Sequence, residues 1–177
     1  MSLIDPIGIP KGRAGRFMVD GVADGYEAFA LAALAAEIGG EGPLLFVARD
    51  GQRLPAITEA LAFAAPELPV LEFPAWDCLP YDRVSPGSDA AARRLDAMAA
   101  MIALAKKPHR AIILTTANAI LQRVPPAAAV EAQTFQARSG NQIDMNVLIG
   151  RLENSGFERV ATVRDVGEFA VRGGILD

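Results

Sequence analysis

The sequence is poor in the residues that build metal and redox sites. Its 177 residues include one cysteine, Cys78, and one histidine, His109. A single cysteine excludes a disulfide within the chain, and one histidine beside it is too few for a zinc site made by the protein. We therefore expect no metal and no cofactor. We also predict that Cys78 is buried and inert and that His109 lies in a loop.

Long apolar runs and a secretion signal are missing as well. The alanine-rich stretches are interrupted by charges such as Glu37 and Lys106, so none predicts a membrane-spanning helix. The first ten residues contain Asp5, Pro6 and Pro10 instead of a basic segment followed by an apolar one. With 51% hydrophobic and 21% charged residues, the chain is typical of a soluble globular protein. We expect it in the cytoplasm.

Lysine is scarce, and the net charge is −4. A negative chain does not favour broad adhesion to nucleic acid, although a local arginine patch is compatible with it. Beyond Lys107 every positive charge is an arginine, the residue best suited to bidentate pairing with carboxylates at interfaces. A skewed base composition of the genome would produce the same bias.

The first predicted turn lacks the residues of a phosphate-binding loop. It joins a strand at 16–20 to an amphipathic helix at 26–38 that Gly39 and Gly40 end. A working loop, G-x-x-x-x-G-K-[ST], uses backbone amides and a lysine to hold phosphates and a hydroxyl to hold Mg²⁺. The turn therefore has to be compared with that pattern residue by residue.

When the first glycine of the pattern is aligned with Gly21, Glu27 takes the lysine position and Ala28 the hydroxyl position. Gly25 lies in the same turn. A carboxylate at the lysine position repels a triphosphate, so we interpret the turn as a degenerate P-loop and expect no ATP chemistry. The alternative is an ordinary strand-to-helix turn in which Asp24 caps the helix.

Strands and helices continue to alternate up to about residue 125. Further strands are predicted at Leu44–Ala48, which is apolar throughout and so expected to be covered on both faces, at Val70–Phe73 and at 111–115. A further helix is predicted from Pro55 to Ala65. The next is capped by Ser88 and Asp89 and has an apolar stripe of Leu95, Met98, Met101, Ile102 and Leu104. A short helix follows the strand at 111–115 and runs through Gln122. We predict a loose lead-in at 1–15 and a parallel α/β domain at 16–125.

The pattern changes after Pro126. We predict a more polar strand at 130–137, a helix capped by Asp144 and ended by Gly156, and short strands at 157–163, at 168–172 and from 175 onward. Val147, Leu148 and Leu152 mark one side of the helix. Residues 126–177 therefore predict a small α+β domain, which we expect to be truncated at its C-terminus and to lean on its neighbour for stability.

Three blocks of residues stand out beyond these patterns. The first runs from Phe73 to Asp82 and continues with Ser85-Pro86 and Arg93-Arg94-Leu95, the second is 115–126, and the third joins 156–159 to 167–173. In this order the blocks resemble the bacterial transcription-repair coupling factor family, Mfd. The resemblance covers about 16–177 and points to the N-terminal, UvrB-like region of that family.

The resemblance implies a helicase-like α/β domain without an ATP site, and a small inserted α+β domain similar to domain 2 of UvrB. It also implies that the small domain docks onto UvrA and recruits it to RNA polymerase stalled at a DNA lesion, in transcription-coupled nucleotide excision repair. The parent's C-terminal region would mask this surface until it is needed. Binding of RNA polymerase and DNA, and ATP-driven translocation, are implied only for other parts of the full-length protein.

The third block contains the predicted docking residues. Arg172 matches an arginine that contacts UvrA in the UvrB docking domain, and Arg159 matches a second one. Because a strand alternates its faces, Phe169 pointing into the core would turn Arg172 outward. Arg164 and Glu168 are near enough to join this patch. A merely solvated arginine is the alternative for Arg172, and a core position is the alternative for Phe169.

The block from Trp76 to Asp82 carries family residues without an evident chemical task. Its two carboxylates, Asp77 and Asp82, would suit acid–base catalysis, but no nucleophile, histidine or metal cluster accompanies them. We expect a structural role in which the prolines shape the loop and the aromatic residues fill the core. A contact with DNA is the alternative, because the corresponding UvrB loop approaches DNA.

Three functions are compatible with the sequence. The first, which we favour, is a non-catalytic interaction module that binds UvrA. The second is a nucleotide hydrolase with an unconventional phosphate loop, which ATP binding would reveal. The third is DNA binding through the Trp76 loop, which salt-dependent DNA affinity would reveal.

Overall fold

The computed structural model describes residues 14–37, 42–79 and 83–177. Its elements are α1 (Glu27–Glu37), β1 (Leu44–Ala48), α2 (Leu54–Ala64), β2 (Val70–Phe73), α3 (Ser88–Lys106), β3 (Ile112–Thr116), α4 (Ala117–Leu121), α5 (Ala127–Gln133), α6 (Met145–Asn154), β4 (Glu158–Arg159), β5 (Glu168–Phe169), β6 (Val171–Arg172) and β7 (Ile175–Leu176). The strands predicted at β1 and β2 are confirmed with the same bounds. None of the helices in the described ranges has the length and apolar character to cross a bilayer.

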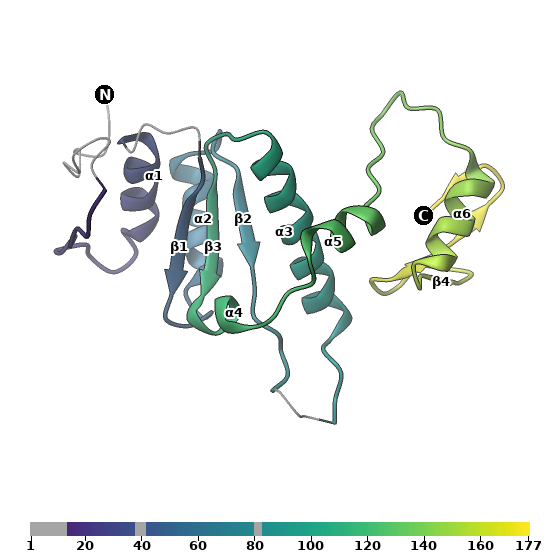
Figure 1. Ribbon diagram of the computed structural model, residues 1–177, viewed down its shortest axis with the longest axis horizontal. Helices are drawn as coiled ribbons and strands as arrows, with labels where there is room; N and C mark the ends of the chain where they lie inside the picture. Colours follow the sequence, from purple (N-terminus) through teal and green to yellow (C-terminus); the bar gives the residue numbers. More distant parts are fainter. Residues whose placement is uncertain (1–13, 38–41, 80–82) are drawn as a thin grey trace.

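Three strands form a parallel sheet in the order β1-β3-β2. In the middle strand, Ile113 pairs with Leu45 on one side and with Leu71 on the other, and every residue of β3 is buried. Helices α1 and α2 pack on one face of this sheet and α3 on the other (Figure 1). The predicted parallel α/β layer is confirmed, but with three strands instead of four.

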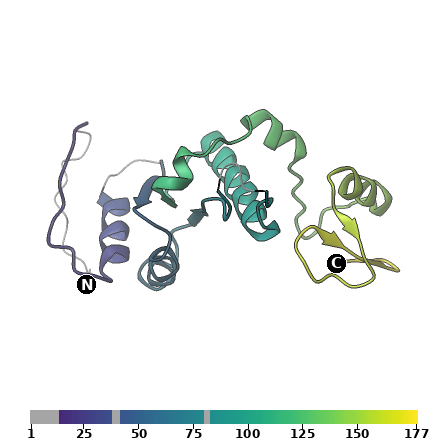
Figure 2. The ribbon, with the colours of Figure 1, turned by 90° about the horizontal axis from the view of Figure 1, so that it is seen from below.

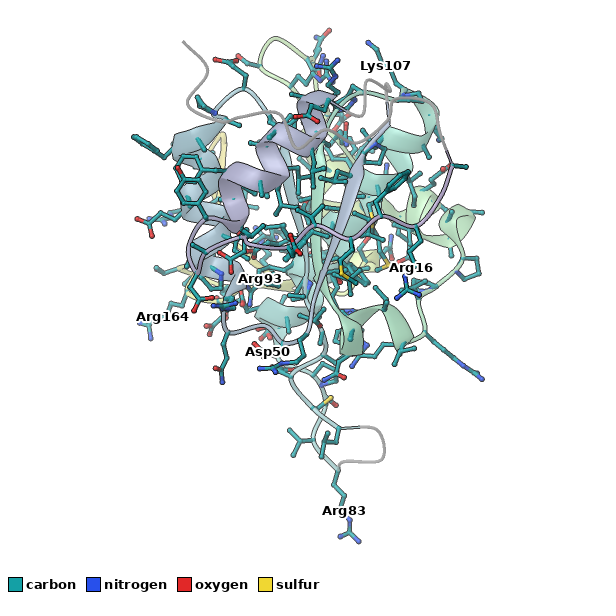
Figure 3. All side chains as sticks on the ribbon, turned by 90° about the vertical axis from the view of Figure 1, so that its left-hand side faces the viewer. Arg16, Asp50, Arg83, Arg93, Lys107 and Arg164 are labelled. Carbon is teal, nitrogen blue, oxygen red and sulfur yellow. The ribbon has the colours of Figure 1, made fainter. Side chains whose placement is uncertain are left out.

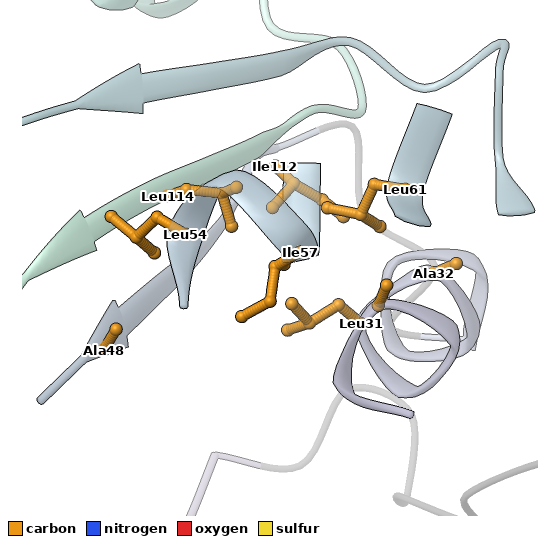
Figure 4. Close-up of a cluster of buried hydrophobic side chains, with 9 residues drawn as sticks. Leu31, Ala32, Ala48, Leu54, Ile57, Leu61, Ile112 and Leu114 are labelled. Carbon is orange, nitrogen blue, oxygen red and sulfur yellow. The ribbon is translucent and has the colours of Figure 1, made fainter. Parts of the chain in front are cut away.

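The main apolar core lies between the sheet and the helices α1 and α2. Leu61, Ile112 and Leu114 are 0% exposed, and Leu31 and Ile57 pack with them (Figure 4). Alternation along β3 sends Ile112 and Leu114 to this face. Because burial of one such side chain stabilises a fold by about 1.5–3 kcal/mol, this cluster is what holds both helices on the sheet.

The strand predicted at 16–20 is wrong. Residues 14–20 form no regular element and are exposed, with Met18 at 89%. A short apolar run such as Phe17-Met18-Val19 favours a strand, but a strand also needs a partner for its backbone groups. No strand of the described chain pairs with this segment. Phe17 and Val19 therefore remain in contact with solvent.

The edge strand β1 is covered on one face only, which corrects the prediction of two covered faces. Leu44 and Phe46 pack against the main core. Leu45 and Val47, on the opposite face, are 54% and 40% exposed. Helix α3 packs at the other edge of the sheet, against β2, and leaves this part of β1 open.

Helix α5 replaces the strand that the sequence predicted at 130–137. Val130 is buried in a cluster with Met98 of α3. Lys106, at the end of α3, forms an ion pair of 3.0 Å with Glu131. Alanine is the strongest helix former, and the alanine-rich start of α5 outweighs the short alternation that follows it.

An irregular connection, 134–144, leads to a small helix–strand module. Its helix, α6, begins where the sequence predicted, because the carboxylate of Asp144 accepts hydrogen bonds from the backbone of Asn146 and Val147 at 2.9 and 3.2 Å. It is followed by Gly156, whose φ of 87° suits glycine. The cap and the stop of this helix are both confirmed.

The strands of the module are shorter than predicted. β4 pairs with β5 in parallel, and β6 pairs with β7 in the antiparallel direction. The strand predicted at 168–172 is interrupted at Ala170, because β5 and β6 belong to two different sheets. The module is thus two small sheets beside one helix.

The module lies next to α5, at the end of the molecule farthest from α1 (Figures 1 and 2). Arg151 of α6 joins it to the connection. Its Nη2 donates to the carbonyl oxygen of Thr134 at 3.2 Å, and its guanidinium lies 5.2 Å from the ring centroid of Phe135. Exposed contacts of this kind contribute about 0.5–1 kcal/mol each, so they orient the module only weakly.

Arg94 organises the loop after β2. Its guanidinium lies 4.2 Å from the ring centroid of Phe73 and 4.5 Å from that of Trp76. Nη1 donates to the carbonyl oxygen of Pro74 and to Oε1 of Gln122, which also accepts from the backbone amide of Trp76. Arg94 is 0% exposed, and burial lowers its pKa. The first two sequence blocks are therefore not independent, because they meet at this guanidinium.

The buried face of α3 differs from the predicted stripe in one position. Leu95 is 50% exposed, whereas its neighbour Arg94 is buried. Met98 and Leu104 are buried as predicted. Periodicity assigns a charged residue to the solvent side, but here the guanidinium lies against two aromatic rings and its Nη1 donates to two acceptors. Its buried Nε and Nη2 have no hydrogen-bond partner among the described residues.

Asp77 joins the start of the same loop to its end, at the beginning of α3. Its two carboxylate oxygens lie 3.1 and 3.2 Å from the amide nitrogen of Gly87, the N-cap residue of α3. The predicted capping by Ser88 and Asp89 is wrong, because both lie inside the helix. A Cβ atom at Gly87 would lie 2.6 Å from Asp77 Oδ2, so a side chain at this position would displace the Asp77 carboxylate.

Cys78 is half-buried, which corrects its predicted burial. His109 lies in an exposed loop as predicted, with Nδ1 3.0 Å from the carbonyl oxygen of Lys107. Tyr81 and Asp82 of the first block, the predicted helix stop at 38–40 and most of the predicted lead-in lie outside the described residues.

Replacing Arg94 with alanine is expected to lower the free energy of unfolding by about 2–4 kcal/mol, because it removes two ring contacts and leaves a buried gap. Urea denaturation followed by circular dichroism measures the change.

Arg93→Ala is the matched control, since Arg93 is 54% exposed and forms an ion pair of 3.0 Å with Asp89. We expect it to cost at most about 1 kcal/mol. Equal losses in the two variants would contradict the role given to Arg94.

Candidate docking surface

The turn that the sequence aligns with a phosphate loop is occupied by the chain's own charged groups. Gly21 and Gly25 have φ values of 73° and 85°. Oε2 of Glu27 accepts from the amide of Gly25 at 2.8 Å. α1 begins at Glu27, three residues after the predicted cap residue Asp24. The carboxylate of Asp24 lies 2.7 Å from Nη2 of Arg53, whose Nη1 lies 3.1 Å from Glu27. Arg53 thus links the start of α2 to the start of α1.

These contacts leave little in the turn that would hold a phosphate. The hydrogen bond and charge of Asp24, followed by the charge of Glu27, raise the pKa of Arg53. Ala28, at the hydroxyl position of the pattern, is 1% exposed and packs in the main core. A triphosphate would meet two carboxylates here. Sequence reasoning missed Arg53 because it lies 29 positions from Asp24.

Arg172 lies on the outer surface of the small module. Its side chain is 62% exposed, and its Nη2 lies 3.0 Å from Oδ2 of Asp177. In the β6–β7 hairpin, Arg172 is opposite Ile175, and the backbone groups of Ala170 and Asp177 bond each other at 2.9 and 3.1 Å. Directly and diagonally opposite residues share a face. We call Arg172, Ile175 and Asp177 the hairpin face.

The outward position predicted for Arg172 is confirmed, but alternation along one strand is not the reason. Phe169 and Ala170 are adjacent, yet they are 2% and 0% exposed. Ala170 lies between β5 and β6, which belong to two different sheets, so one alternating strand does not run from Phe169 to Arg172. Phe169 is a core residue and does not present its ring to a partner.

Glu168 holds a turn together. Its Oε2 accepts from the backbone amides of Arg164 and Asp165 at 2.7 and 3.1 Å, and these hydrogen bonds lower the pKa of Glu168. The side chain of Arg164 points away from the ribbon (Figure 3). Arg159 is exposed on β4, in register with Phe169 of β5. The module thus carries the three predicted arginines on its surface.

Sequence reasoning missed two members of the hairpin face, Ile175 and Asp177. The signal was present, because Gly173-Gly174 between two short strands is typical of a hairpin. Pairing across that turn places residue 175 opposite Arg172. Ile175 is 63% exposed and supplies apolar surface next to the guanidinium.

Comparison with known proteins places these features in a family. Residues 135–177 match the UvrB interaction domain. The Transcription-repair-coupling factor of Myxococcus xanthus is 33% identical over 143 residues, which are 76% of this chain and 12% of that protein. The chain belongs to the transcription-repair-coupling factor family.

Other coupling factors give the same picture. That of Escherichia coli K12 is 27% identical over 150 residues, or 84% of this chain and 13% of that protein. That of Mycobacterium tuberculosis is 29% identical over 147 residues, or 81% of this chain and 12% of that protein. The chain therefore spans only 12% to 13% of the length of these relatives.

In this coupling-factor chain, we expect Glu168 to titrate below the ordinary glutamate pKa of about 4.3. A carboxyl group whose pKa is lowered by folding adds stability that is present above its unfolded pKa and is lost as the pH falls through its folded pKa. An NMR titration of the side-chain carboxyl carbon measures this pKa. Titration at or above the ordinary value would contradict the two backbone hydrogen bonds.

Proposed function

We propose that this chain is a non-catalytic part of a transcription-repair coupling factor that binds UvrA and recruits it to RNA polymerase stalled at DNA lesions. The observation that carries the proposal is Arg172, 62% exposed on a module that matches the UvrB interaction domain. We assign docking to the small domain at 126–177 and a scaffold role to the α/β domain at 16–125.

The chemistry of the hairpin face suits a protein partner. A planar guanidinium pairs bidentately with carboxylates, and truncating a fully desolvated arginine costs about 2–5 kcal/mol of binding free energy. Ile175 adds apolar surface beside the charge, and interfaces combine these two properties at their centres. Arg159 and Arg164 place further positive charge on the same module.

The remaining activities belong to the rest of the full-length protein in this proposal. The chain spans 12% to 13% of its relatives, so the ATP-driven translocase that displaces RNA polymerase lies outside it. We assign contacts with RNA polymerase and DNA to those other parts, and masking of the docking surface to the parent's C-terminal region.

Arg172→Ala is expected to weaken binding of UvrA by at least about tenfold, because the guanidinium supplies charge-assisted hydrogen bonds that alanine cannot replace. Isothermal titration calorimetry of UvrA with the chain and the variant measures the change.

Arg138→Ala is the matched control, because Arg138 is an exposed arginine in the connection before α6 and its loss changes the net charge equally. We expect UvrA affinity within about twofold of the wild type. Equal weakening in both variants, or no binding by the wild-type chain, would rule out docking through Arg172.

ATP is expected to show no saturable binding to this chain, because Glu27 and Asp24 occupy the turn where phosphates would lie. Calorimetric titration with millimolar MgATP tests this. Saturable binding that a Gly25→Val substitution abolishes would instead support a nucleotide hydrolase with an unconventional loop.

A further inference from the structure

The guanidinium of Arg172 already holds a carboxylate in the free chain. The contact joins one nitrogen, Nη2, to one oxygen, Oδ2 of Asp177, at 3.0 Å. It is an end-on contact, and both side chains are well exposed, at 62% and 43%. Exposed pairs of this kind are weak, because water competes for both groups and two side chains lose freedom. The contact is therefore easy to exchange.

The backbone keeps Asp177 within reach of Arg172. The amide of Asp177 donates to the carbonyl oxygen of Ala170 at 2.9 Å, and the amide of Ala170 donates back at 3.1 Å. These two bonds fix the diagonal position of Asp177 on the hairpin face. Any other carboxylate that approaches Arg172 must compete with a group that is always close by.

We propose that Asp177 is an internal competitor for docking, and that binding exchanges it for an aspartate or glutamate of the partner protein. The inference rests on the docking role proposed for Arg172. The partner's carboxylate takes the guanidinium through two nitrogens, while an apolar group beside it covers Ile175. Exchange is favourable because a bidentate pair inside an interface is stronger than an end-on pair in water.

Asp177→Asn tests the exchange. Asparagine keeps the two backbone bonds and nearly the same shape but removes the charge that holds Arg172. Asp165→Asn is the matched control, since Asp165 is an exposed carboxylate of the same module and its replacement changes the net charge equally. Calorimetric titration with UvrA should show Asp177→Asn binding about two- to fivefold more tightly than Asp165→Asn.

A second arm uses the Arg172→Ala background. Without the guanidinium there is nothing to release, so Asp177→Asn should bind UvrA no more tightly than Asp165→Asn does in that background. Thermal unfolding of each variant, followed by circular dichroism, verifies that the hairpin mutations leave the fold intact.

The outcomes separate this inference from the docking role itself. If Arg172→Ala weakens binding while the two asparagine variants bind equally, docking through Arg172 stands and the internal competition is wrong. If Arg172→Ala leaves the affinity unchanged, both are wrong. If Asp177→Asn still binds more tightly than Asp165→Asn without Arg172, the gain does not come from releasing the guanidinium, and the exchange is overturned.

Discussion

The pairing of β3 with a strand on each side is the constraint on which the rest of the α/β domain depends. It buries the whole strand and leaves one helical layer on each face of the sheet. It also places the end of β2 beside the segment after β3, so that Trp76 and Gln122 meet Arg94. Without that central strand, the apolar clusters and the Arg94 contacts would have no common support.

Three of the arginines that make contacts within the chain differ in burial, and this difference separates their roles. Arg94 lies among rings and is fully buried, so it can only support the fold. Arg53 joins two helices through Asp24 and Glu27 at the surface. Arg172 is paired yet exposed, which leaves its guanidinium accessible to a partner. The same residue type therefore serves stability in one place and recognition in another.

Local patterns predicted most of the regular elements, because apolar periodicity and caps act over a few residues. The bounds of β1 and β2 and the Asp144 cap of α6 were all found in this way. The segment at 16–20 failed because a strand needs a partner that local sequence does not reveal. Ile175 and Asp177 were missed because they join Arg172 only through the register of a hairpin.

The sequence by itself determined the class of the fold, the family blocks and the absence of a lysine and a hydroxyl at the phosphate turn, because these depend on residue identity and short-range order. Tertiary structure decided the rest: which face of β1 stays open, that Arg94 is buried in place of Leu95, and that Asp177 reaches Arg172. Each of these depends on contacts between segments whose separation along the chain does not specify their distance in space.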